Sequence, residues 1–424
     1  MPDRSPFQKA LTEALASGKE LWKVVRALED SKITTADDAQ AVCDAIKTKG
    51  WQGGKRGPLS DERTLLGLLQ RVSGVTAGDV IRREVMPEIV GEVERSIEAC
   101  PPGAKPSDDT MFMLKLIALY AIPQGVELIA RAIHKPVAPG DFMWCVILGL
   151  FAGGHPQAEE LVRQLSDPLP GGFAGVAFLD TVNRMALKDE LRPHAFDRPA
   201  GHAMLEAWLR DSDPGHFSYA HSATASLPFI SAPARNSLLA LAMDHSDPGV
   251  QMEAAWASAK LGNESGVKML ARFAADTRYS KSARRYLEEM GREDAIPEIA
   301  NDPDFAALAE MSNWLAHPSE FGRLPDGIEL FDTRELYWPP TDDRRSVWLL
   351  KYTYKGGKED GSDEVGLGMV GSVTFALFSE SSADLSAEDA YALHCCWELQ
   401  MNKDARAPEK RTIEAGRRIL GQYQ

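Results

Sequence analysis

Apolar side chains recur every three or four positions through the first hundred residues, a spacing that predicts amphipathic helices. The clearest runs extend from Leu11 to Leu28 and from Leu65 to Val72. The stretch WQGGKRGPLSDE (51–62) interrupts this period with glycine and proline, and its Ser60 is a predicted N-cap for the helix that follows. A second interruption, CPPGAKPSDDT (100–110), predicts the end of an N-terminal helical region over residues 1–105.

The middle of the chain repeats itself. Ser-Asp-Pro occurs at 166–168, 212–214 and 246–248, and the last two copies lie 34 residues apart (246 − 212). Aspartate followed by proline favours a helix start, with the acid as N-cap and the proline at the first helical position. Small residues recur in the same register, and a shorter third copy follows; the matched positions are Ala220 with Ala254, Ala223 with Ala257, Ala225 with Ala259, Leu227 with Leu261, and Ala254 with Ala283. Gly262 and Gly291 follow the predicted helix ends as left-handed C-caps. These features predict stacked helix pairs.

The segment HSDPGVQMEAAWASAKLGNESGVKMLARFA (245–274) resembles the HEAT repeat family in its Asp-Pro start, its Ala254-Ala255 pair, its Leu261-Gly262 corner and its second amphipathic helix. The resemblance extends over about residues 110–300. It implies a helical solenoid, which we assign to residues 106–303. HEAT solenoids serve as scaffolds, as adaptors and occasionally as enzymes, so the resemblance implies a fold rather than an activity.

Near Ile328 the apolar period changes from 3.6 to 2. The segment 347–354 alternates with its aromatic residues on one face, and the segments 328–336 and 365–378 are also strand-like. Helices are predicted at 387–401, capped by Ser386, and at 409–420. The predicted fold class is therefore mostly α: a HEAT-like α-α solenoid followed by a smaller C-terminal α+β domain, residues 304–424, with a short antiparallel sheet and two helices.

The charge of the chain argues against one class of partner, nucleic acid. The formal net charge is −15, and the basic residues occur only as short pairs, so we expect no nucleic-acid partner. The longest apolar run, 142–152, is too short to span a membrane, and the N-terminus shows no secretory signal. The five cysteines are irregularly spaced and suggest neither a disulfide framework nor a zinc site. Together these features predict a cytoplasmic protein.

Three motifs suggest chemistry without the context that the chemistry needs. GLGMVGSV (366–373) matches a nucleotide-binding glycine pattern, but an acidic loop precedes it and strand-like sequence follows, so we expect packing glycines. Histidines gather between His194 and His245, and the pair His216 and His221 lacks the i, i+4 spacing of a helical metal site. His394-Cys395-Cys396 lies inside a predicted helix, where adjacent side chains diverge. We therefore expect no catalytic residue, no cofactor and no metal ligand.

The sequence favours a non-catalytic scaffold or adaptor that binds protein partners. Two alternatives stay open: a small-ligand or chromophore-handling protein or enzyme that uses the concave face of the solenoid, as HEAT-type bilin lyases do, and an acidic inhibitor or immunity protein. If the C-terminal domain binds a partner, the segment FDTRELYWPPTDDRRSVW (331–348) supplies the candidate contacts Arg334, Trp338, Arg344 and Trp348. Arginine and tryptophan dominate binding hot spots, yet the same residues also anchor loops and pair internally, which is the stronger expectation here.

Overall fold

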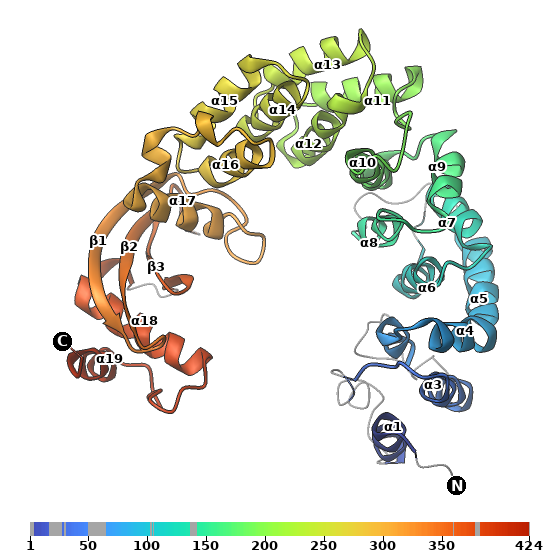
Figure 1. Ribbon diagram of the computed structural model, residues 1–424, viewed down its shortest axis with the longest axis horizontal. Coiled ribbons are helices and arrows are strands. Elements are labelled where there is room, and N and C mark those ends of the chain that lie inside the picture. Colours follow the sequence, from blue (N-terminus) through green and yellow to red (C-terminus); the bar gives the residue numbers. More distant parts are fainter. Residues whose placement is uncertain are drawn as a thin grey trace. The chain divides into compact units, whose positions relative to one another are not determined.

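The computed structural model describes residues 4–16, 28, 31–49, 65–101, 104, 106–135, 142–358, 360–377 and 382–423 (Figure 1). The chain forms two compact units, residues 1–246 and 247–424. The predicted helical run over Leu21–Val25 and the predicted N-cap Ser60 lie outside the described residues. No described helix is long and apolar enough to cross a membrane.

The described part of the first unit consists of helices, the loops that join them and one isolated β-bridge between Ile33 and Val72. Its α-helices are α1 (Pro6–Ala16), α3 (Ala36–Lys49), α4 (Val75–Glu84), α5 (Met86–Ala99), α6 (Asp108–Leu119), α7 (Gly125–His134), α8 (Met143–Gly149), α9 (Ala158–Ser166), α10 (Gly172–Leu187), α11 (Pro199–Arg210), α12 (Phe217–Ser226) and α13 (Ala234–Met243). Three 3₁₀ turns accompany them: η1 (Leu65–Arg71), η2 (Pro214–His216) and η3 (Leu227–Phe229). The predicted helix after residue 64 is thus a 3₁₀ turn, in which five successive residues from Leu65 are buried.

The second unit begins with the helices of the predicted repeat, α14 (Pro248–Lys260), α15 (Glu264–Ala274) and α16 (Ser280–Glu289) (Figure 1). Asp247 caps α14, because its carboxylate accepts the backbone N–H of Val250 at 2.9 Å. Gly262 and Gly291 have φ angles of +85° and +68°, which confirms both predicted left-handed turns. The repeated alanines Ala254, Ala257 and Ala283 are fully buried, so neighbouring helices approach closely.

Only one Ser-Asp-Pro copy starts an α-helix directly. Pro214 opens the turn η2, three residues before α12, and Asp213 caps that turn. After Asp167 the helix α10 begins only at Gly172, since a second proline, Pro170, follows and disfavours helical backbone in the residue before it. An Asp-Pro start outside the repeat register opens α17 (Pro303–Leu315), which Asp302 caps through the N–H groups of Asp304 and Phe305. Two 3₁₀ turns, η4 (Glu293–Ala295) and η5 (Glu298–Asn301), precede it.

The C-terminal sheet has four antiparallel strands in the order β1-β2-β3-β4: β1 (Gly327–Trp338), β2 (Asp343–Tyr354), β3 (Glu364–Val370) and β4 (Thr374–Leu377). After the turn η6 (Ser382–Asp384) come α18 (Ala387–Met401) and α19 (Ile413–Gly421). Ser386 caps α18 as predicted. The last helix starts at Ile413 rather than 409, because Thr412 is its N-cap.

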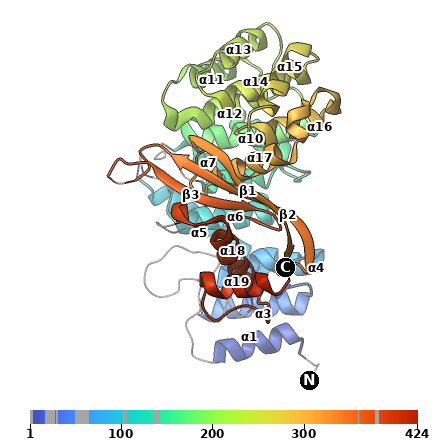
Figure 2. The same cartoon turned by 90° about the vertical axis from the view of Figure 1, so that its left-hand side faces the viewer.

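Helices cover both faces of this sheet (Figure 2). Val347 and Leu349 pack with α18 and α19, whereas Leu350, Tyr352 and Tyr354 pack with α17. The alternation predicted for β2, with its aromatic face, is therefore confirmed. So is the fold class, mostly α with a smaller C-terminal α+β domain. The predicted domain boundaries after residues 105 and 303 stay predictions, and the compact units divide at 246/247.

The predicted strand 365–378 is two strands. The chain turns at Gly371–Val373 between β3 and β4, which adds a fourth strand to the three expected. The glycines of GLGMVGSV serve packing, as expected: a Cβ at Gly366 would lie 2.4 Å from the Tyr352 hydroxyl oxygen, and one at Gly368 would lie 2.5 Å from Cε of Met311. A Cβ at Gly371 would lie 3.0 Å from Cγ1 of Val347, which is a less severe contact.

Candidate functional site

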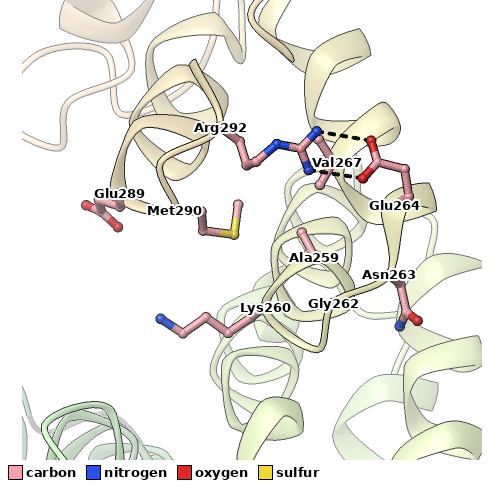
Figure 3. Close-up of a pocket in the computed structure, with 9 residues that line it drawn as sticks. All are labelled: Ala259, Lys260, Gly262, Asn263, Glu264, Val267, Glu289, Met290 and Arg292. Atoms are coloured by element: carbon pink, nitrogen blue, oxygen red, sulfur yellow. Dashed lines mark hydrogen bonds and ion pairs between the residues drawn. The ribbon is translucent and has the colours of Figure 1, made fainter. Parts of the chain in front are cut away.

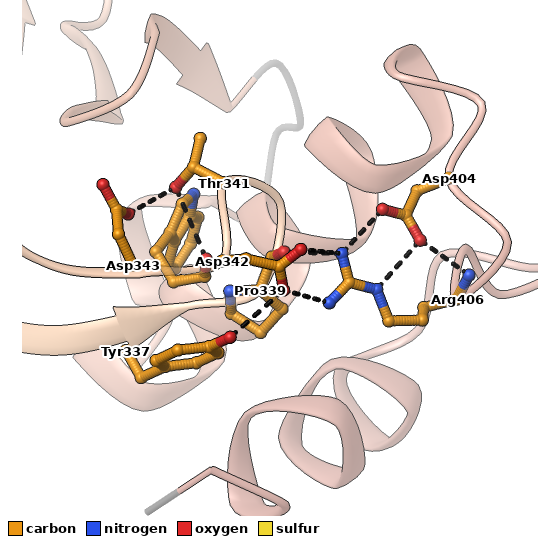
Figure 4. Close-up of polar contacts among 8 residues, drawn as sticks. Tyr337, Pro339, Thr341, Asp342, Asp343, Asp404 and Arg406 are labelled. Atoms are coloured by element: carbon orange, nitrogen blue, oxygen red, sulfur yellow. Dashed lines mark hydrogen bonds and ion pairs between the residues drawn. The ribbon is translucent and has the colours of Figure 1, made fainter.

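The predicted contact segment forms the β1–β2 hairpin, whose turn is held in place by one arginine (Figure 4). Arg406, from the loop after α18, donates from Nη1 to Asp342 Oδ1 at 2.6 Å and from Nη2 to the Pro339 carbonyl at 2.8 Å. Asp404 holds the other edge of the guanidinium, accepting from Nε at 2.9 Å and from Nη2 at 2.7 Å. The bond from Arg406 lowers the pKa of Asp404 to about 2 and holds the pKa of Asp342 below its usual value. The turn therefore has a defined shape before any partner arrives.

Aromatic contacts extend this arrangement. The Tyr337 hydroxyl donates to Asp342 Oδ1 at 3.1 Å, and its ring stacks on Tyr423 with centroids 4.7 Å apart and planes inclined by 21°. Thr341 donates to Asp343 at 2.7 Å within the turn. The hairpin tip is thus joined to the segments that flank α19.

Three of the four predicted contact residues, Arg334, Trp338 and Trp348, donate hydrogen bonds to carboxylates of the same chain. Arg334 donates to Asp332 at 2.7 Å and to Glu388 at 2.8 Å, and its guanidinium lies over the Tyr391 ring. The indole N–H of Trp348 donates to Asp304 at 2.7 Å. These internal bonds account for the positions of Arg334 and Trp348 with no need for a binding partner, as expected for residues that anchor loops and pair internally.

The structure contradicts the prediction that Trp338 contacts a partner. Its side chain is 0% exposed and its indole N–H donates to Glu398 at 2.8 Å, so the ring cannot touch a partner of the folded chain. The cause is the packing of this end of β1 against α18.

Arg344 is the predicted residue that remains at the surface. Its side chain and that of Glu335 are each 69% exposed, with Nε and Oε1 3.6 Å apart. Such an exposed pair contributes little stability. Its neighbour Arg345 is bound instead by Asp343, at 2.6 and 2.8 Å. The hairpin therefore presents one loosely paired guanidinium beside a rigid turn.

A second candidate lies among the repeat helices, where a cavity of about 430 Å³ opens between the turns that end α14 and α16 (Figure 3). Arg292 spans it, with Nη1 and Nη2 donating to Glu264 at 3.0 and 3.1 Å and Nε to Asp294 at 3.0 Å. Lys260 points away from the helices into the opening. The lining is mostly polar, and its arginine is already fully paired, which suits a joint between repeats better than an apolar ligand pocket.

A third cluster is buried beneath the β3–β4 turn. Glu398 is 2% exposed, and the hydroxyl of Ser372 donates to its carboxylate, with Oε1 at 2.6 Å and Oε2 at 2.7 Å. His394, one helical turn earlier, is 0% exposed, and neither ring nitrogen has a hydrogen-bond partner. Burial lowers the pKa of His394 to about 3. The sequence marked His394 only as part of His-Cys-Cys and gave no signal for Glu398, whose burial depends on the distant Trp338 and Ser372.

The histidines of the first unit have separate partners. His194 Nε2 lies 3.0 Å from Asn183 Oδ1, His202 Nε2 lies 3.0 Å from Asp197, and His216 Nδ1 lies 2.9 Å from Asp211. Burial lowers the pKa of His194 to about 4. Across the described parts of the chain, no group of three or more His, Cys, Asp or Glu side chains is placed to hold a metal ion. The five cysteines are free thiols.

Comparison with protein-family models, with curated proteins and with solved structures finds no match to this chain.

Proposed function

We propose that this chain is a non-catalytic protein-interaction scaffold or adaptor whose helix pairs are of the HEAT type. The observation that carries the proposal is the stacking of α14, α15 and α16. Buried alanines join these helices, left-handed glycines turn the chain after α14 and α16, and Arg292 ties the turn after α16 to the start of α15. Stacked pairs of this kind expose one face of each helix in series, which is an extended surface suited to a protein partner.

The hairpin adds a preformed contact. Its turn is fixed by Arg406, so a partner would bind it at little entropic cost, and Arg344 is the exposed cation beside it. We propose Arg344 as the partner contact, with Arg334 on β1 and Trp348 on β2 supporting the hairpin that carries it.

We expect that partner to be a protein and the compartment to be the cytoplasm. The net charge of −15 opposes a phosphate backbone, and the five free thiols fit a reducing environment. The cavity between α14 and α16 has the volume of a small-ligand site, but its paired charges lack the apolar lining of one.

The test is capture of partners by the tagged full-length chain from its own cell lysate, followed by native mass spectrometry of the purified complex. A stoichiometric protein supports the proposal. A small bound mass in place of a protein points to a ligand-handling function and contradicts it, as does recovery of the chain alone under conditions that preserve weak complexes.

The captured partner then allows a matched comparison. Arg344→Glu should weaken its affinity by about 5- to 30-fold, which corresponds to about 1–2 kcal/mol, with an unchanged melting temperature. Lys358→Glu is the control, because it makes the same charge change on an exposed side chain of the β2–β3 loop. If Arg344→Glu and Lys358→Glu reduce the affinity equally, Arg344 of the hairpin is not part of the interface.

A further inference from the structure

Three elements of the C-terminal domain meet at one buried carboxylate. Glu398 on α18 accepts the indole N–H of Trp338 at the end of β1 and the hydroxyl of Ser372 in the β3–β4 turn. Both bonds reach Oε2, at 2.8 and 2.7 Å, and the Ser372 hydroxyl also lies 2.6 Å from Oε1. Ser372 is partly accessible and Val373 beside it is 38% exposed, so the turn that covers the buried carboxylate itself faces solvent.

His394 lies next to this carboxylate without joining the hydrogen bonds. Its Nε2 is 4.0 Å from Glu398 Oε2, beyond hydrogen-bonding distance. Aromatic rings surround it from three elements, with centroid separations of 6.1 Å for Trp338, 5.9 Å for Phe375 and 5.6 Å for Trp397. A neutral imidazole with two unpaired nitrogens is costly in such a place, and packing alone would favour phenylalanine.

Few ionisable groups among the described residues lie near His394. From α18 itself Glu398 and Cys395 lie nearby, and Cys395 is also within the electrostatic reach of Asp404 and Arg406 in the following loop. From β2, Arg345 interacts with Glu398 at longer range but is bound to Asp343. Trp338 of β1, Phe375 of β4 and Ser372 carry no charge. Among the described residues, Glu398 is therefore the carboxylate next to His394.

We propose that His394 and Glu398 form an acid-released latch on the β3–β4 turn. Near neutral pH, His394 is neutral and Glu398 holds the turn through Ser372. When His394 takes up a proton, its charge lies among aromatic rings, and Oε2 of Glu398 is 4.0 Å away and already accepts hydrogen bonds from Trp338 and Ser372. The imidazolium is poorly solvated in this buried place, so the turn opens to admit water, and Ser372 releases both oxygens of Glu398.

The size of the effect follows from the difference in the pKa of His394 between the closed and open states of the turn. The pKa of His394 is about 3 when it is buried and near 6.5 when it is exposed, so acid favours the open turn. Opening should become about tenfold more favourable for each pH unit below 6.5. At pH 5.0 the turn should therefore open about 30-fold more often than at pH 7.5.

Hydrogen exchange of the full-length chain, read by mass spectrometry and corrected for the pH dependence of chemical exchange, tests this. The amides of Met369–Phe375 should lose about 30-fold in protection between pH 7.5 and pH 5.0, while those of α15 change little. In His394→Phe, which keeps an aromatic ring but cannot titrate, protection of the turn should be independent of pH. In Ser372→Ala it should be low at both pH values.

Two results would overturn the proposal: pH-independent protection in the wild type, or the same acid loss in His394→Phe. If that variant fails to fold, the ring nitrogens of wild-type His394 can be followed by nuclear magnetic resonance. Titration near 6.5 without any loss of turn protection would also overturn it, because His394 would then be protonated in the closed state.

Discussion

Replacing Gly416 by alanine tests how closely α18 and α19 pack. A Cβ at Gly416 would lie 2.1 Å from the carbonyl oxygen of Ala392, 2.4 Å from its carbonyl carbon and 2.7 Å from its Cα. A methyl carbon normally stays more than about 3 Å from an oxygen, so the helices must separate by roughly 1 Å. All three atoms belong to the backbone of α18, so no side-chain rotation can relieve the contact.

Two energies oppose each other in this variant. Alanine gains about 1 kcal/mol over glycine inside a helix, whereas overpacking a core costs about 1–3 kcal/mol. Because the clash is with backbone, we expect the upper end of that cost and a net loss of about 2 kcal/mol in the free energy of unfolding. For a unit of this size the melting temperature should fall by roughly 4–8 °C.

The assay is thermal and urea unfolding of the full-length chain, with Gly421→Ala as the matched control. Gly421 ends the same helix, and a Cβ there would meet nothing within 4 Å. The control should be as stable as the wild type or slightly more so. If Gly416→Ala is as stable as the wild type, α18 and α19 are not held in close backbone contact at Gly416.

Three further predictions concern stability. Asp247→Ala should destabilise the second unit by about 1 kcal/mol in urea unfolding, whereas Asn263→Ala should cost less, because Asn263 makes no capping hydrogen bond. Trp338→Phe should cost about 2–3 kcal/mol in the same assay, since it leaves a buried carboxylate short of a donor, and Trp348→Phe should cost less because its partner carboxylate is only half-buried. Because His194 binds a proton more weakly in the folded state, its contribution to stability is complete above pH 6.5. The free energy of unfolding should fall by about 1.4 kcal/mol per pH unit as the pH decreases from 6.5 toward 4. Urea titrations at several pH values should show this slope in the wild type and not in His194→Gln.

Local patterns predicted the C-terminal elements well because their causes are local. The two-residue period of β2 reflects the pleat of a strand with helices on both faces, and Ser386 caps α18 through the residues next to it. The local apolar pattern did not predict the break between β3 and β4. A run such as GLGMVGSV alternates across the break, and its turn depends on contacts of Gly371 with Val347 in another strand.

The candidate site was only partly predictable for a related reason. Arginine and tryptophan are enriched in binding hot spots, but they also bury readily beside a carboxylate, and the deciding partners lie far along the chain. Arg334 is bound by Glu388, 54 residues away, and Trp338 by Glu398, 60 residues away. No short pattern reveals either pair.

The positions of Arg344 on β2 and of Trp338 on β1 follow from the alternation of side chains along each strand. In regular strands alternate residues share a face, which places Arg345 on the side of Val347 and Leu349, against α18, and leaves Arg344 on the other side. The same counting from Ile328 and Leu330, which pack toward α17, would place Trp338 toward α17 as well. The register shifts between Leu330 and Asp332, however, so that Phe331 is an extra residue and every later position of β1 changes face. That bulge carries Trp338 to α18, where it meets Glu398, and so removes it from the surface on which a partner could bind.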